Sequence, residues 1–396
     1  NYEASERSSN FPWPWPGGEW GLPDIVEYQE SGALALLTNA AKNREYWLRN
    51  FYAINKRAVD GREGFPAAWL IPAGQESVGL NSVLRILTMG DVEVHQAMHS
   101  FRANGKSFPE GTYVIPMTQP YSAFANTMLA KTEYPDLREY PGGPPQRPYD
   151  VTAHSIPMLM GIEAESVDYP VEALLSEAIP TPDFNFETPR ELRGRRAPDL
   201  AIYKGFQEPM MAGWTRWVFD QHEIEYDTLH NADVRIGQLE DDYDVILFQG
   251  QTPNSIMNGF GAGDGQIGVM PPEYQGGIGE AGAAELRQFV EDGGRIVAIE
   301  QATELMIEIF DLPVRNVVEG LENTEFYIPG SLPRTVGDDG SENVAWFWRS
   351  SRAFEVQGPN VTPVSWFAAD DPLATGWALG REHVAGKVAA LSARVG

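Results

Sequence analysis

Apolar residues recur at steps of three and four from Ile25 to about Asp60, and this spacing predicts one long amphipathic helix. Asp24 stands before the helix as an N-cap, with Glu27 three positions later, and Gly61 ends it. A smaller α/β unit is expected after this helix. Its predicted strands lie at 67–73, 92–95 and 112–116, with a helix at 76–89.

From about Asp199 to Asp311, short apolar runs alternate with helical patterns. This alternation predicts an α/β fold with a doubly wound, parallel sheet of the flavodoxin-like kind. The first predicted helix places Trp214, Trp217 and Val218 on its inner face. The expected strands are 200–203, 226–229, 244–248 and 295–299, and the expected helices are 212–221, 236–241 and 281–291.

Proline-rich and polar stretches divide the chain into five parts. A basic cluster of four arginines, Arg190, Arg193, Arg195 and Arg196, marks the linker between the two α/β regions. The sequence after Phe326 is rich in aromatic residues and has strand-like patterns, which predicts a β-rich C-terminal part. The predicted parts are an irregular segment rich in proline and tryptophan (1–23), an α/β region (24–176), a linker (177–198), a second α/β domain (199–325) and a β-rich extension (326–396).

The formal charge of -27 changes the range of partners that can be expected. An acidic surface repels nucleic-acid phosphates and anionic lipid heads, so neither nucleic acid nor a membrane surface is an expected partner. The chain has no cysteine, which excludes disulfides, thiolate metal sites and cysteine nucleophiles. No apolar run has the length of a membrane span, and no signal peptide is visible. Because the sequence starts at Asn1 and stops in a strand-like run, truncation at both ends is expected.

Histidine spacings raise two metal-site hypotheses. His95 and His99 are four positions apart, but the local pattern is that of a strand, in which such residues lie about 13 Å apart. His222 and Glu225 have the His-x-x-Glu spacing of zinc peptidases, yet they lie at a helix end away from the carboxyl edge of the sheet, with no obvious third ligand. Both pairs are better explained as ordinary surface residues.

Two further motifs concern the second α/β domain. The run 277–282 (GIGEAG) matches G-x-G-x-x-G, but prolines precede it where a dinucleotide site needs a strand, so an ordinary helix start is favoured. After the fourth strand, where a nucleophile elbow belongs, Gln301 and Ala302 cannot attack an acyl carbon. Glu208, Glu300 and Gln301 are the candidate ligand-binding residues, because all are expected near the carboxyl edge of the sheet.

Three blocks of sequence carry a resemblance to known families. One runs NFPWPWPGGEWGLPDIVEYQ into the long helix, and another reads GTYVIPMTQPYSAFANTMLA followed by YPGGPPQRPYDVTAHSIPMLMG. Both resemble the segment after the catalytic domain in large bacterial zinc-carboxypeptidase-like proteins of the carboxypeptidase A type. The third block, from Leu200 to Asp311, resembles the class I glutamine-amidotransferase-like domain that ends such proteins.

The resemblance implies a parent protein that hydrolyses peptides. In that family a His-x-x-Glu pair and a later His bind zinc, and a further Glu is the general base. All four residues are expected before Asn1, so no zinc and no complete catalytic site are expected within this chain. The resemblance further implies an extracellular or periplasmic location, with peptide as the substrate of the parent.

Two functions therefore remain open. The first is a non-catalytic, accessory part of a zinc metallocarboxypeptidase-like hydrolase. The alternative is a module with a cysteine-less, amidotransferase-like fold that binds a small molecule or a carbohydrate. The carbohydrate possibility rests on aromatic density at Trp346, Trp348, Trp366 and Trp377, since aromatic rings stack on sugars as well as pack in cores.

Overall fold

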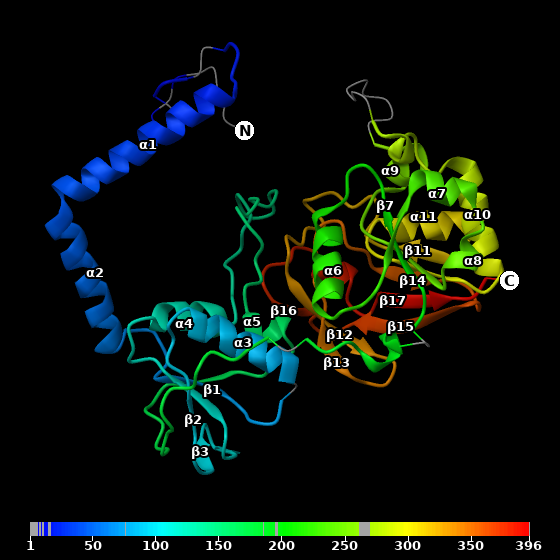
Figure 1. Ribbon diagram of the computed structural model, residues 1–396. Helices are drawn as coiled ribbons and strands as arrows, with labels where there is room; N and C mark the ends of the chain where they lie inside the picture. The colour runs from blue at the N-terminus through cyan, green and yellow to red at the C-terminus, as the bar shows by residue number, and fades with distance from the viewer. Residues whose placement is uncertain are drawn as a thin grey trace.

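The computed structural model describes residues 7, 9, 12–14, 17–75, 77–184, 186–194, 197–260 and 270–395. Figure 1 shows a helical arm at the N-terminal end, a small sheet unit below it, and a larger body that contains a parallel and an antiparallel sheet. Arg195, Arg196, residues 261–269 and eleven of the residues 1–23 lie outside the described residues.

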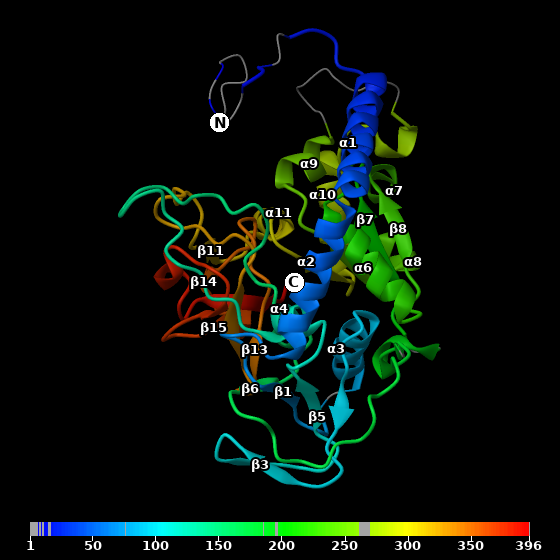
Figure 2. The same ribbon diagram turned by 90° about the vertical axis from the view of Figure 1, so that its left-hand side faces the viewer.

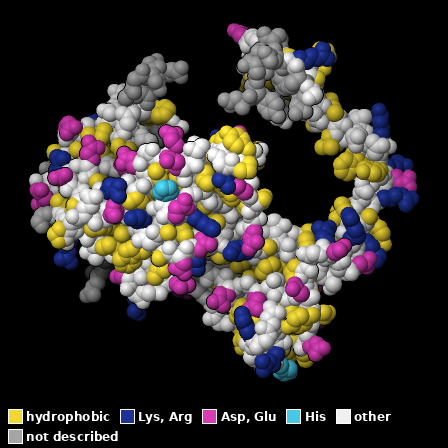
Figure 3. All heavy atoms as spheres, turned by 180° about the vertical axis from the view of Figure 1, so that it is seen from behind, with side chains coloured by type: hydrophobic (Ala, Val, Ile, Leu, Met, Phe, Trp, Pro, Cys, Tyr) yellow, Lys and Arg dark blue, Asp and Glu magenta, His cyan; other side chains and the backbone are white. Residues whose placement is uncertain are grey.

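The first two helices form an arm (the helical arm, residues 22–59) that stands clear of the body in Figures 1 and 3, whereas in Figure 2 it faces the viewer and crosses in front of the body. The single helix expected here is two helices, because Asn43 leaves the helical conformation between them. Gly21, not Asp24, is the N-cap, and the Gly21 N–H donates to Asp24 Oδ2 at 2.8 Å. Only Ala58 is buried in the arm. The two helices are α1 (Leu22–Lys42) and α2 (Arg44–Val59).

The small unit is an antiparallel sheet in the order β2-β5-β1-β6, with helices on one face. Leu84 and Leu87 of α3 pack on Ile71 and Ile115 of the sheet. A separate hairpin, β3–β4, turns through the Asn104-Gly105 pair, whose positive φ angles of 47° and 74° suit a type I′ turn. The elements are β1 (Ala68–Ile71), α3 (Ser77–Met89), β2 (His95–Gln96), β3 (Phe101–Ala103), β4 (Lys106–Phe108), β5 (Tyr113–Pro116), α4 (Ser122–Leu129), α5 (Ile156–Leu159) and β6 (Glu165–Val167).

The second unit (the parallel-sheet unit, β7 to α11) confirms a mixed α/β fold with a parallel sheet. The strand order is β10-β9-β7-β8, so the chain adds strands first on one side of β7 and then on the other. A short 3₁₀ turn at 190–192 precedes it, and another at 272–274 lies within it. Its elements are β7 (Leu200–Lys204), α6 (Met210–Gln221), β8 (Asp227–His230), α7 (Asn231–Ile236), α8 (Leu239–Asp242), β9 (Val245–Phe248), α9 (Pro253–Asn258), α10 (Gly279–Glu291), β10 (Arg295–Ala298) and α11 (Ala302–Ile309).

The two faces of the parallel sheet differ in how well they are covered. Phe248 packs with Leu286 and Phe289 of α10 in the main core, on the face that α7, α10 and α11 cover. Helix α6 lies on the opposite face (Figure 1). The inner-face prediction for α6 is wrong: Trp214 is 67% exposed, and Trp217 and Val218 are exposed too, so Ala212 alone is buried. An amphipathic pattern in the sequence shows that a helix has an apolar face, but it does not show that another element covers that face.

The C-terminal part is an antiparallel sheet in the order β11-β14-β17-β15-β12-β13, with β16 paired to β12. It is hydrogen-bonded to the small unit: Thr375 Oγ1 donates to the Thr132 carbonyl at 2.9 Å, and the Trp377 N–H donates to Thr152 Oγ1 at 3.2 Å. The elements are β11 (Val314–Asn316), β12 (Leu332–Gly337), β13 (Glu342–Val344), β14 (Phe354–Val356), β15 (Val361–Phe367), β16 (Leu373–Thr375), a 3₁₀ turn (Arg381–His383) and β17 (Val388–Ala393).

Candidate functional site

The candidate site lies at the carboxyl edge of the parallel sheet. Three loops meet there: 205–208 after β7, 249–251 after β9, and 299–301 after β10. The order of strands reverses direction between β7 and β9, and ligands of open α/β sheets bind in the crevice at such a switch point. The strand register brings the loops side by side, since Tyr203 of β7 stacks on Phe248 of β9 with ring centroids 4.7 Å apart.

Glu300 makes the sharp turn between β10 and α11. Its φ is 55°, in the left-handed region that costs a residue with a side chain about 1–2 kcal/mol. The turn therefore falls on Glu300, whereas the sequence predicts the elbow one residue later, at Gln301 and Ala302. Strained non-glycine residues cluster at functional sites, because surrounding contacts must hold them in place.

The Glu300 carboxylate is half-buried, with a hydrogen bond from Ser350 on one side and the backbone of Gly250 close on the other. Ser350 Oγ donates a hydrogen bond to Glu300 Oε2 at 3.0 Å. A Cβ atom added to Gly250 would lie only 2.7 Å from the same oxygen, so the missing side chain of Gly250 lets the carboxylate approach the end of β9. Burial raises the pKa of Glu300, while the bond from Ser350 and the charge of Arg352 oppose that rise.

Two buried glutamines flank Gly250. Gln249 is 3% exposed, and its Oε1 accepts from Thr215 Oγ1 of α6 at 3.0 Å. Its Nε2 is buried and has no hydrogen-bond partner in the described part of the chain. Gln251 Nε2 donates to the Gln207 carbonyl at 3.0 Å, which ties the β9 loop to the β7 loop. A buried amide with an unused donor suits a polar ligand or a water molecule at this edge.

The other two predicted residues have different surroundings. Arg216 donates to the Glu208 carboxylate at 3.0 Å, and Lys204 Nζ lies 3.8 Å from it, so Glu208 is neutralised beside α6. Gln301 occupies the N-cap position of α11, and its side chain makes no hydrogen bond within the described residues. The structure thus places all three predicted residues at one edge without bringing Glu208 into contact with Glu300.

A pocket of about 310 Å³ adjoins this edge, and sequence reasoning missed it. It lies between α11, the loop 316–328 and the turn 349–352. Arg352 Nε donates to Glu304 Oε1 at 2.6 Å, and Asn316 Nδ2 donates to the same oxygen at 3.0 Å. The turn 349–352 also carries Ser350, so the pocket and Glu300 share one wall. The only sequence signal is a W-R-S-S-R run at 348–352 in an acidic chain.

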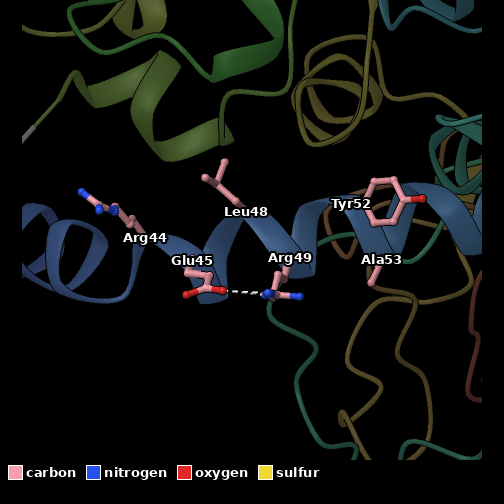
Figure 4. Close-up of a pocket in the computed structure, with 6 residues that line it drawn as sticks. All are labelled: Arg44, Glu45, Leu48, Arg49, Tyr52 and Ala53. Atoms are coloured by element: carbon pink, nitrogen blue, oxygen red, sulfur yellow. Dashed lines mark hydrogen bonds and ion pairs between the residues drawn. The ribbon is translucent and has the colours of Figure 1, made fainter.

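A hollow beside α2 is not a site of this kind. Figure 4 shows that a single helix lines it, with side chains that point to different sides. Glu45 and Arg49 bond to each other there, and both are largely exposed. A surface formed by one helix encloses nothing, so this hollow belongs to the exposed arm.

The histidines do not assemble a metal site. His95 Nδ1 lies 2.9 Å from the Ser176 carbonyl, whereas His99 is exposed. His222 Nδ1 lies 2.6 Å from the Glu187 carbonyl, and Glu225 is exposed. Among the described residues, no group of three or more His, Asp or Glu side chains could hold a metal ion. None of the described helices is both long and apolar enough to cross a membrane.

Packing accounts for the glycines of the G-x-G-x-x-G match. Gly277 lies against the backbone of Met257, and Gly282 lies against Ile278 and Val234, so neither has room for a side chain. Gly279 has a φ of 59° at the start of α10. These glycines hold α9, α7 and α10 together, and none of them follows a strand.

The tryptophans that suggested a sugar site do not share one exposed surface. Trp377 is buried, and its ring lies 6.2 Å from that of Tyr327. Trp346 is exposed, whereas Trp348 and Trp366 are partly buried. Stacking on a sugar needs an open ring face, which Trp377 lacks.

Comparisons with known proteins add little to this picture. The chain matches no protein family and no curated protein. Among solved structures it is similar to the "Cytoplasmic Protein STM3548 from Salmonella typhimurium", with 14% sequence identity and a TM-score of 0.27. That similarity covers 42% of this chain and 78% of the other, and it is too distant to carry an argument.

Proposed function

We propose that the parallel-sheet unit is a binding module that holds a small polar molecule at the carboxyl edge of its sheet. The observation that carries this proposal is Glu300, a residue with a positive φ whose half-buried carboxylate accepts a bond from Ser350 and lies in the space that Gly250 leaves open. A positive φ also occurs at the exposed Glu223, so the burial of Glu300 and its bond from Ser350 are what set it apart. A carboxylate so placed is suited to bind a ligand donor or to exchange a proton with it.

The fold proposed for this unit is flavodoxin-like and resembles class I glutamine amidotransferases. The strand order β10-β9-β7-β8 supports it, because the same order of addition around a first strand defines that class. In such a unit Glu300 occupies the turn after the fourth strand, where the resembling enzymes carry a nucleophile. A carboxylate does not replace a thiolate in acyl transfer, so binding is the role that fits these residues.

A thermal-shift screen of the intact chain against polar metabolites tests this function. A ligand at about 100 times its Kd stabilises the protein by about 2.7 kcal/mol. The shift is expected to be lost in the Glu300→Gln variant and kept in the Glu308→Gln variant, a matched control that changes an exposed glutamate of α11, the helix that follows Glu300. Ligands that stabilise both variants equally would place the binding site elsewhere and refute the proposal.

The helical arm favours a second function, as an accessory part of a zinc-carboxypeptidase-like protein. Leu48 and Phe51 are 68% and 64% exposed on α2, and such large apolar side chains normally pack on a partner. On this proposal the partner is the catalytic domain, and zinc, peptide hydrolysis and an extracellular or periplasmic location belong to the parent protein. The arm would brace that domain.

The gene upstream of this chain tests the accessory function first. It must encode a His-x-x-Glu pair and a later His, and without them the idea fails. If the upstream gene encodes these zinc ligands, Phe51→Asp should weaken binding to the separately produced upstream domain by about tenfold, since a buried charge is costly. Asn50→Asp, a change of charge at an exposed neighbour, should leave binding unchanged.

A further inference from the structure

The pocket beside α11 has a size and position that suit a small ligand. Its volume of about 310 Å³ is at the lower end of the roughly 300–1,000 Å³ typical of small-molecule sites. Glu304 enters it from α11, one helical turn after Glu300. Ser350, which bonds Glu300, lies between the two arginines that line the pocket, Arg349 and Arg352.

The two arginines leave donors available to a ligand. Arg352 Nε donates to Glu304, and its Nη1 donates to the carbonyls of Ser350 and Ser351. Its Nη2 has no hydrogen-bond partner among the described residues, although the side chain is only 13% exposed. Arg349 lies over the Trp348 ring, 5.4 Å from its centroid, and forms no ion pair within the described chain. Both guanidinium groups can therefore receive a carboxylate.

Two carboxylates balance these cations. Glu304 Oε1 accepts from Arg352 and Asn316, while Oε2 accepts no hydrogen bond from the described residues. Glu319 is an exposed residue that lines the pocket, and it forms no ion pair with any described residue. The formal charges that line the pocket cancel, so a dianion such as a phosphate gains little there, whereas a molecule with both signs matches both pairs.

The remaining wall is apolar. Its side chains come from the loop after β11 and the segment before β12, namely Val318, Leu321, Phe326 and Ile328. Phe326 and Ile328 belong to a buried core, which makes this wall rigid. Such a wall favours a ligand that carries a hydrocarbon group beside its charges.

We propose that this pocket binds a zwitterionic small molecule, a free α-amino acid with an apolar side chain. Its carboxylate would contact Arg349 and Nη2 of Arg352, and its ammonium group would contact Glu304 Oε2 or Glu319. The inference rests on the proposed binding function and names its ligand class. The shared turn 349–352 connects the occupied pocket to Glu300 through Ser350.

Isothermal titration of the intact chain with leucine and two analogues tests the ligand class. 4-Methylpentanoate lacks the ammonium group of leucine, and 3-methylbutylamine lacks its carboxylate. Leucine is expected to bind at least about tenfold more tightly than either analogue, because each loses charge-assisted hydrogen bonds. Equal affinity for leucine and one analogue would overturn the zwitterion assignment.

Variants locate the binding. Arg349→Gln is expected to weaken leucine binding by about tenfold or more, since an exposed arginine can be replaced without unfolding the protein. Arg102→Gln, on the exposed hairpin β3–β4, is the matched control and should bind leucine like the unchanged protein. Binding that survives Arg349→Gln undiminished would overturn the pocket as the site.

The outcomes separate this inference from the function on which it rests. If leucine, isoleucine and phenylalanine all fail to bind at millimolar concentration, the amino-acid inference is overturned. The proposed binding function then still stands if screened ligands lose their thermal shift in Glu300→Gln. If no ligand depends on Glu300 while leucine depends on Arg349, the pocket is retained and the role of Glu300 is refuted.

Discussion

The contact between Gly250 and Glu300 can be tested by adding one methyl group. In Gly250→Ala the new Cβ would lie 2.7 Å from Glu300 Oε2 and 3.1 Å from Met211 Cε. The backbone at Gly250 is outside the left-handed region, so the methyl group adds no backbone strain of its own. Glu300 must therefore move, and its hydrogen bond from Ser350 is lost or lengthened.

The expected destabilisation follows from three terms. Losing the hydrogen bond to the carboxylate costs about 1.5 kcal/mol, and a displaced side-chain rotamer costs about 1 kcal/mol. Replacing glycine by alanine stabilises the protein by about 0.5 kcal/mol, because it lowers the conformational entropy of the unfolded chain. Gly250→Ala should therefore destabilise the protein by about 2 kcal/mol. In a Glu300→Ala background the same change should cost nearly nothing, because only the flexible end of Met211 remains close.

Thermal unfolding of the two single variants and the double variant measures this coupling. A loss of about 2 kcal/mol lowers Tm by roughly 4–8 °C in a domain of about 150–250 residues. Gly213→Ala is the control, because Gly213 lies in α6 with nothing within 4 Å, and there alanine should stabilise the helix by up to about 1 kcal/mol. Additive effects of Gly250→Ala and Glu300→Ala would refute the close approach of the carboxylate to β9.

Other predictions follow from burial. Burial raises the pKa of Glu300 above its ordinary 4.5, so the folded protein favours the protonated carboxyl group. The stability gained from that proton is complete below pH 4.5 and is lost as the pH rises through the folded-state pKa. The Tm of Glu300→Gln relative to that of the unchanged protein should therefore be higher at pH 7 than at pH 4. Gly277→Ala should lower stability by about 3 kcal/mol in urea unfolding, since its Cβ would meet the backbone of Met257. Leu286→Ala, in the core, should cost about 2–5 kcal/mol in the same assay, and Leu48→Ala, on the arm, less than about 0.5 kcal/mol.

Each of these has a result that would contradict it. A difference in Tm between Glu300→Gln and the unchanged protein that stays the same from pH 4 to pH 7 would show that the carboxylate is not desolvated. A neutral Gly277→Ala would mean that α9 and the start of α10 can separate, against the hydrogen bond from Ile278 N–H to the Ile256 carbonyl at 2.9 Å. A large loss of stability in Leu48→Ala would mean that the arm is packed on something in the isolated chain.

The sequence by itself determined the elements of the parallel sheet. The runs at 200–203, 244–248 and 295–299 are short, apolar and followed by glycine or polar residues, and each forms a strand within a residue or two of its expected ends. The alternation with helices then leaves few ways to build a sheet, so the parallel arrangement follows from the pattern as well. The candidate residues Glu208, Glu300 and Gln301 were also predictable, because strand ends of a parallel sheet share one edge.

Only the tertiary structure decided which of those residues has an unusual environment. Glu300 is half-buried beside Gly250 and Ser350, which come from the loop after β9 and from a turn after β13. Likewise, the pairing of Glu304 with Arg352 joins residues 48 positions apart. The pattern of α6 showed an apolar stripe, yet Trp214 is exposed. Periodicity reports which side chains share a face, whereas burial and charge pairing depend on what other parts of the chain bring to that face.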